Sequence, residues 1–160
     1  DEKIKTFSLK DNINDDLNKI LDKINLDLII LAGYMKILSP EIVEKYHGKI
    51  LNIHPSLLPK YKGINTHQRA INDKESFHGA TVHFVTDKLD EGPLILQQKV
   101  KIDKKDTVET LKEKVHRAEY SIYPLVIKWY TDGYLQQREN YFLFKGAKIE
   151  SPIKDISNIK

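Results

Sequence analysis

The stretch Leu-Asp-Leu-Ile-Ile-Leu-Ala-Gly at residues 26–33 decides the fold class. It is short, apolar at almost every position and closed by Gly33, which is typical of a strand buried on both faces of a parallel sheet. Just before it, residues 11–25 place apolar side chains on one side of a helix, in a background of Asp, Asn and Lys. An amphipathic helix followed by a buried strand indicates an α/β protein.

Caps, turns and hydrophobic runs predict further elements downstream. In order, these are a short helix opened by Ser39-Pro40 and reaching Tyr46, a strand over 49–53, a helix over 65–72, and strands over 79–86 and 94–102. The two later strands are joined by the turn-rich residues 87–93. We therefore expect them to pair in an antiparallel manner.

The longest helix is expected to begin at Asp106-Thr107-Val108-Glu109, where an N-cap and a capping-box glutamate precede apolar residues that continue to Trp129. Pro124 lies inside this helix and lacks a backbone donor, so we expect a kink near Ser121 or two separate helices. Short strands should follow Gly133, and fraying is expected from residue 151. We expect one domain over residues 1–150 and a tail over 151–160.

The composition fits a single core that needs no covalent support. The 160 residues are 40% hydrophobic and include no cysteine, which excludes disulfide scaffolds and cysteine nucleophiles and agrees with a cytoplasmic protein. A net charge of +3, from 26 Lys and Arg against 23 Asp and Glu, does not indicate nucleic-acid binding. The longest apolar run is too short for a membrane span. We expect small-molecule partners, with no nucleic acid and no membrane.

Asn52 and His54 are the first candidates for chemistry. Side chains two apart on a strand share a face, and the carboxyl ends of strands are where α/β sheets bind ligands. This amide and imidazole could serve a reaction, or they could merely satisfy backbone groups of the next loop. The acidic turn nearby offers Asp87, Asp90 and Glu91, and spacing does not choose among them.

Other catalytic and metal-binding patterns are missing from the sequence. His78 and His83 are five apart in a predicted strand, so they should face opposite sides, and we expect no metal site. Ser56 has no G-x-S-x-G elbow around it, and there is no G-x-G-x-x-G or Walker A loop.

The run Leu-Asn-Ile-His-Pro-Ser-Leu-Leu-Pro-Lys-Tyr-Lys-Gly at residues 51–63 resembles the central motif of the 10-formyltetrahydrofolate-dependent formyltransferase family. The segments 78–85 and 87–93 resemble its second block at the expected distance. The branch that formylates glycinamide ribonucleotide in de novo purine biosynthesis shows similar residues at 31–40, 65–67 and 122–126. The resemblance runs from about residue 10 to about residue 140. It implies a Rossmann-like three-layer α/β sandwich with a mostly parallel sheet and helices on both faces.

The resemblance implies that Asn52, His54 and Asp90 form a catalytic trio. The amine of glycinamide ribonucleotide would attack the formyl carbon of the co-substrate 10-formyltetrahydrofolate, with no metal. Asn52 and protonated His54 would stabilise the oxyanion as fixed hydrogen-bond donors. Asp90 would raise the pKa of His54 and orient its ring.

The resemblance also implies two binding regions. The expected folate-binding residues are Lys10, Met35, Lys36, Ile37, Leu38, Asn52, Thr86, Asp87, Lys88, Leu89 and Asp90. The expected glycinamide-ribonucleotide-binding residues are His116, Arg117, Ala118 and Glu119. Glu119 would accept from ribose hydroxyls, whereas the family more often has glutamine where His116 stands. Lys10 would keep the charge of the family's arginine without its fork geometry.

The family opens with a strand, a glycine-rich phosphate-binding turn and a helix, and no residue before position 26 resembles that turn. We therefore expect the N-terminal βαβ portion to be absent from this chain, together with the site for the substrate phosphate. Formyltetrahydrofolate hydrolase is one alternative, although it tends to show His-His-Ser-Phe-Leu-Pro where this chain has His-Pro-Ser-Leu-Leu-Pro at 54–59. Methionyl-tRNA formyltransferase, which normally adds a basic C-terminal domain, and a non-catalytic folate-binding module are others. A monomer or homodimer is expected.

Overall fold

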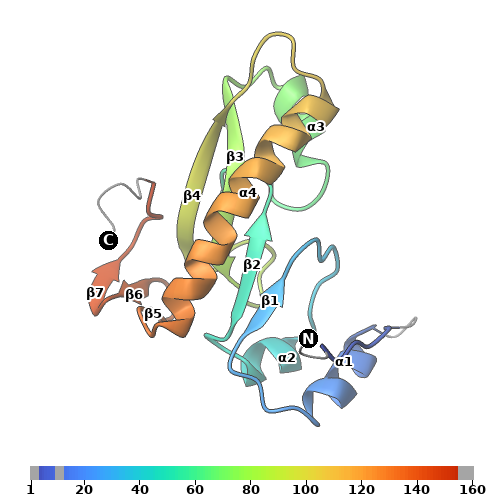
Figure 1. Cartoon of the computed structure of the whole chain (residues 1–160), viewed down its shortest axis with the longest axis vertical. Coiled ribbons are helices and arrows are strands. Elements are labelled where there is room, and N and C mark those ends of the chain that lie inside the picture. The colour runs from blue at the N-terminus through green and yellow to red at the C-terminus, as the bar shows by residue number, and fades with distance from the viewer. Residues whose placement is uncertain (1–3, 10–12, 155–160) are drawn as a thin grey trace.

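The structure of the chain is a computed structural model that describes residues 4–9 and 13–154. Lys10, an expected folate-binding residue, lies outside the described residues. The elements are α1 (Ile13–Leu21), β1 (Ile29–Leu31), α2 (Pro40–Lys45), β2 (Ile50–His54), α3 (Thr66–Asn72), β3 (Phe77–Phe84), β4 (Leu94–Lys101), α4 (Val108–Thr131), β5 (Leu135–Gln137), β6 (Phe142–Phe144) and β7 (Ala147–Ile149) (Figure 1). The helices and strands expected from the sequence are therefore confirmed, with shorter bounds for α1 and β1.

The strands β1 to β4 form one sheet in the order β1-β2-β3-β4. β1 and β2 are parallel, whereas β2 pairs with β3 and β3 with β4 in antiparallel fashion. The α/β class is confirmed, but this sheet is mixed rather than mostly parallel. The physical reason is the connection over 85–93, which has no crossover helix and therefore returns β4 alongside β3 in the opposite direction.

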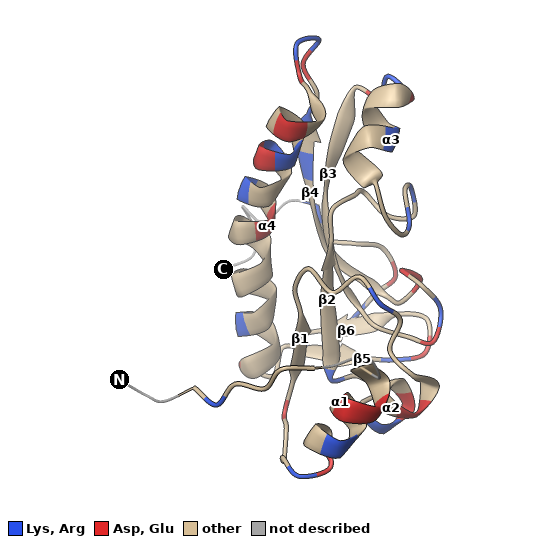
Figure 2. Cartoon of the chain, turned by 90° about the vertical axis from the view of Figure 1, so that its right-hand side faces the viewer, with Lys and Arg blue, Asp and Glu red and all other residues tan. Residues whose placement is uncertain are grey.

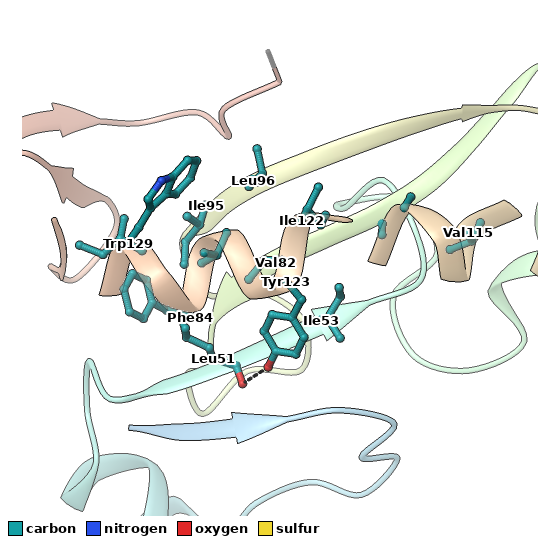
Figure 3. Packing of buried hydrophobic residues seen from close by; sticks show 14 of the residues in the cluster. Leu51, Ile53, Val82, Phe84, Ile95, Leu96, Val115, Ile122, Tyr123 and Trp129 are labelled. Carbon is teal, nitrogen blue, oxygen red and sulfur yellow. Dashed lines mark hydrogen bonds between the residues drawn. The ribbon is translucent and has the colours of Figure 1, made fainter. Parts of the chain in front are cut away.

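Alternation along β2 and β3 places apolar side chains on one face of the sheet and polar side chains on the other near the carboxyl end of β2. Leu51 on β2 and Val82 on β3 point toward α4 and join a core that also contains Trp129, as Figure 3 shows. Asn52 and His54 lie at the intervening positions of β2, so they project from the opposite face. The core with α4 therefore packs on one face of the sheet, and Asn52 and His54 lie on the opposite face.

The helix α4 runs unbroken over 24 residues despite the proline inside it. Pro124 is exposed, so solvent can hydrate the Tyr120 carbonyl that the missing N–H leaves free. A division into two helices is therefore wrong. The capping box differs from expectation, because its second member is Thr110 and not Glu109. The Thr110 backbone N–H donates to the Thr107 hydroxyl, and the Thr107 backbone N–H donates to the Thr110 hydroxyl.

The strand β1 is less buried than its sequence predicts. Ile30 is 46% exposed, because β1 is the edge strand of the sheet and its outward side chain meets no covering element among the described residues. The other face of β1 and β2 is covered by a second apolar cluster with Ile42 and Ile50 at its centre. Figure 2 shows α4 on one side of the sheet and α1 and α2 on the other.

The strands β5 to β7 form a second, antiparallel sheet of three strands. Ile153 then returns to the main sheet as a bridge to Leu96, with its N–H donating to the Ile95 carbonyl over 2.9 Å. Fraying from residue 151 is therefore wrong for the segment up to Ile153. The domain boundary at residue 150 stays a prediction. Within the described ranges, no helix has the length and apolar character needed to cross a bilayer.

Candidate active site

Three polar side chains that the sequence singled out meet at the carboxyl end of β2. Asn52 and His54 come from the polar face of that strand, and Asp90 comes from the turn between β3 and β4. The Nδ1 atom of His54 lies 3.5 Å from a carboxylate oxygen of Asp90, and both side chains are buried. The spacing in sequence could not choose Asp90 from its acidic neighbours, but the fold does: Asp87 and Glu91 are exposed.

Asp90 is held in place by its backbone and by its surroundings. Its φ angle is 52°, a left-handed value that short polar residues tolerate. The backbone N–H of Gly63 donates to Oδ2 over 2.8 Å. On its other side, Oδ1 lies 3.7 Å from Nε2 of His83. One carboxylate thus stands between two imidazoles.

His83 is a site residue that sequence reasoning missed. Its Nδ1 lies 2.8 Å from the Phe84 carbonyl, which only accepts, so Nδ1 carries the hydrogen and Nε2 is left as an acceptor. The amide nitrogen of Asn52 donates to that Nε2 over 3.1 Å. Burial lowers the pKa of His83, which favours this neutral form. His83 therefore fixes the Asn52 amide, whose second N–H can still donate to a ligand.

A sequence signal for His83 does exist. Thr81 and His83 alternate with Val82 and Phe84, so the polar pair must share the face of β3 opposite the core. What the sequence lacks is the register, in which Asn52 pairs with His83 across β2 and β3.

The sequence left two roles open for His54, which were to serve a reaction or to bond a backbone group of the next loop, and the structure is compatible with both. Its Nε2 lies 2.9 Å from the backbone carbonyl of Tyr61, so one nitrogen does satisfy a loop group. Because a carbonyl accepts, Nε2 must carry a hydrogen. The other nitrogen faces Asp90 at a distance beyond an ordinary hydrogen bond, which leaves Nδ1 free to serve a reacting group.

A buried polar network fixes the loop that follows His54. The hydroxyl of Thr81 donates to the Ser56 carbonyl over 2.6 Å, and the Gln97 amide donates to the Leu58 carbonyl over 2.7 Å. Both anchoring side chains come from the polar face of the sheet, on β3 and β4. These hydrogen bonds therefore fix the loop to strands β3 and β4.

The expected folate-binding residues divide into exposed and buried groups. Met35, Ile37 and Leu89 are large apolar side chains that are 83%, 64% and 51% exposed. Lys36, Asp87 and Lys88 are also exposed, and Thr86 is half-buried. Leu38, by contrast, is buried and packs in the cluster beneath α2. Exposed apolar side chains of this kind suit a flat, partly apolar ligand.

The expected substrate-binding residues lie on α4. Arg117 is exposed, while Ala118 is buried in the core beneath the helix. His116 and Glu119 lie on the same side of α4, with Nε2 and Oε2 separated by 3.9 Å. Burial raises the pKa of Glu119, and His116 partly opposes that effect. The half-buried carboxyl of Glu119 is thus available as an acceptor near the polar edge of the core.

Two further histidines lie between α4 and the site. Burial, followed by the nearby charges of His116, Lys112 and His54, lowers the pKa of His67 to about 4. Its ring lies edge-on to that of His78, with centroids 5.2 Å apart. His116 on α4 and His54 on β2 therefore both lie near the pair formed by His67 and His78. Among the residues described, no three His, Asp or Glu side chains converge as metal ligands would.

Comparisons with known proteins identify the family. Residues 2–127 match the model of the formyl transferase family. The phosphoribosylglycinamide formyltransferase of Haemophilus influenzae is 49% identical over 145 residues, which are 91% of this chain and 68% of that protein. The protein of the same name from Escherichia coli is 44% identical over 89% of this chain and 68% of its own length.

A solved structure gives the same result. The phosphoribosylglycinamide formyltransferase of Coxiella burnetii superposes with a TM-score of 0.82 at 43% identity, over 90% of this chain and 69% of that one. The chain thus spans about two thirds of the length of these relatives. A family match over most of the chain, with relatives of this identity, shows that the chain belongs to the formyl transferase family.

Proposed function

We propose that this chain transfers a formyl group from 10-formyltetrahydrofolate to the amine of glycinamide ribonucleotide, a step of de novo purine biosynthesis. The observation that carries the proposal is the meeting of Asn52, His54 and Asp90 at one strand end, in a chain 49% identical to a phosphoribosylglycinamide formyltransferase. These three groups supply hydrogen-bond donors and a carboxylate, which are what direct formyl transfer requires.

The co-substrate supplies the formyl carbon. The substrate amine attacks this carbon, a C–N bond forms and the carbonyl electrons move onto oxygen. The free N–H of Asn52 and a proton on Nδ1 of His54 would stabilise that oxyanion. Collapse of the oxyanion then breaks the bond to N10, which takes a proton through His54 while the attacking nitrogen loses one to solvent or to Asp90. The carboxylate of Asp90, 3.5 Å from Nδ1, would orient the His54 ring and interact favourably with positive charge that develops on it.

The two ligands would bind on either side of His54. The exposed side chains of Met35, Ile37 and Leu89 would bury apolar surface against the folate rings. His116, Arg117 and Glu119 would bind glycinamide ribonucleotide, with Glu119 accepting from ribose hydroxyls. A cytoplasmic location and a monomer or homodimer remain part of the proposal.

The test measures formyl transfer to glycinamide ribonucleotide by the 160-residue chain and by a version that includes any residues preceding it in its reading frame. Product that depends on glycinamide ribonucleotide, in either version, supports the proposal. Release of formate that is independent of glycinamide ribonucleotide would instead identify a hydrolase. Folate binding without turnover in both versions would identify a non-catalytic module, and either of these results refutes the proposal.

His54→Ala is the matched variant for this assay, and exposed His47→Ala is its control. We expect His54→Ala to lower kcat about 1,000-fold, because it removes both an oxyanion donor and the proton source. His47→Ala should leave the rate unchanged, since this residue lies outside the trio and contacts Gln137. Retained turnover with a large loss of stability in His54→Ala would assign His54 a purely structural role.

A further inference from the structure

Tyr61 adopts a backbone conformation that its size disfavours. Its φ angle is 58°, in the left-handed region where a bulky side chain crowds the following carbonyl. Residues hold such conformations where their surroundings impose them, and they gather at functional sites. Tyr61 lies in the loop after β2, and its backbone carbonyl contacts the catalytic candidate His54.

The side chain of Tyr61 is anchored at the far end of α3. Its hydroxyl lies 2.8 Å from a carboxylate oxygen of Asp73 and 3.1 Å from one of Glu75. The guanidinium of Arg69 lies over the ring at 5.1 Å from its centre, and the ring of His78 meets it edge-on. These contacts hold the phenol against α3 and thereby fix the direction of the backbone at Tyr61.

The anchored residue contacts one ring nitrogen of His54 through its backbone carbonyl. The Tyr61 carbonyl, 2.9 Å from Nε2, requires a hydrogen on that nitrogen, and Nδ1 is then the nitrogen that faces Asp90. We propose that Tyr61 is a positioning residue, which holds one proton of His54 on Nε2 through its anchor on Asp73 and Glu75. Nδ1 is then the nitrogen that takes up and delivers the proton used at the reacting group. The catalytic consequence rests on the proposed formyl transfer, whereas the location of the proton does not.

The first experiment reads the protonation of His54 directly. Nitrogen NMR spectra of the ¹⁵N-histidine-labelled chain, with His54 assigned from His54→Ala, should show Nε2 protonated in the wild type. Tyr61→Phe keeps the ring, its stacking and the volume but loses the anchor, and should shift His54 toward mixed tautomers. Tyr130→Phe is the matched control, because it also removes a hydrogen-bonded tyrosine hydroxyl, one that donates to the Asp27 carbonyl and to no residue of the His54 site.

The second experiment measures catalysis. Tyr61→Phe should lower kcat about tenfold with KM for both substrates nearly unchanged, because the imidazole is mispositioned while the binding groups stay. A double variant, Asp73→Ala with Glu75→Ala, should have the same effect, and adding Tyr61→Phe to it should cause no further loss. Asp73→Asn in the Glu75→Ala background keeps an acceptor for the phenol and should restore the wild-type spectrum.

An unchanged His54 spectrum in both Tyr61→Phe and the double alanine variant would overturn the inference. The inference would also fail if the variants showed a higher KM and a lower Tm while the His54 tautomer stayed unchanged. That pattern would mean that the substitutions only destabilise the loop. Absence of transfer by the wild type would overturn the proposed function alone, since the spectra are recorded without substrate and decide the position of the proton independently.

Discussion

His78 makes the stability of this chain depend on pH. Its side chain is 1% exposed, and its Nε2 has no hydrogen-bond partner in the part of the chain that the structure describes. Burial, followed by the charges of His67 and His54, lowers the pKa of His78 from 6.5 to about 4. As the pH falls, His78 therefore takes up a proton near pH 6.5 in the unfolded chain but only near pH 4 in the folded chain. Stability is full above pH 6.5 and falls as the pH drops toward 4.

The size of this loss follows from the shift in pKa. One pKa unit is worth about 1.4 kcal/mol, so below both pKa values the loss from His78 is about 3 kcal/mol. At pH 5 the unfolded imidazole is mostly charged and the folded one mostly neutral, which makes the loss about 2 kcal/mol relative to pH 8. His67 shifts in the same direction but is half-buried, so solvent screening makes its contribution smaller.

The assay is urea unfolding, followed by circular dichroism at pH 8 and pH 5, of the wild type and of His78→Phe. Phenylalanine keeps an aromatic ring edge-on to His67 but cannot take up a proton. We expect the wild type to lose about 2 kcal/mol more than His78→Phe between the two pH values. The exposed His47→Phe should behave as the wild type does. An equal loss in the wild type and His78→Phe would refute the reasoning, because the titrating group would then be another one.

Three further perturbations test the site and the fold. Asp90→Asn should lower kcat about 100-fold by removing the negative charge beside Nδ1 of His54, while its fold persists because asparagine tolerates the left-handed φ of 52°; steady-state kinetics and circular dichroism check both. Gly92→Ala should destabilise the chain by about 1–3 kcal/mol in urea unfolding, because the new Cβ would lie 1.9 Å from the Phe84 carbonyl oxygen. Tyr123→Phe should cost about 1–2 kcal/mol in the same assay, because the buried hydroxyl donates to carbonyls of β1 and β2. Unchanged midpoints in the last two variants would contradict the packing described.

Local signals were enough to predict most elements. Ser39 is the N-cap residue of α2 and Pro40 its first residue, and the apolar spacing up to Trp129 does form one face of α4. The errors arose where a distant part of the chain decides the outcome. Ile30 looked buried from its neighbours in sequence, yet its exposure depends on whether another element covers the edge of the sheet. Pro124 looked disruptive, yet its exposed position makes it tolerable.

The sequence by itself determined that Asn52 and His54 share one strand face at a strand end, because alternation along a strand is a property of the local backbone. Its motifs likewise determined the family, which the comparisons confirm. Spacing along the chain did not distinguish Asp90 from Asp87 and Glu91, although the family motif pointed to it. The tertiary structure brings Asp90 to His54 across 36 positions, through a turn whose course depends on β3, β4 and Gly63. It also decided the partners of His83 and Tyr61, since their contacts depend on sheet register and on the packing of α3, and neither is encoded by spacing along the chain.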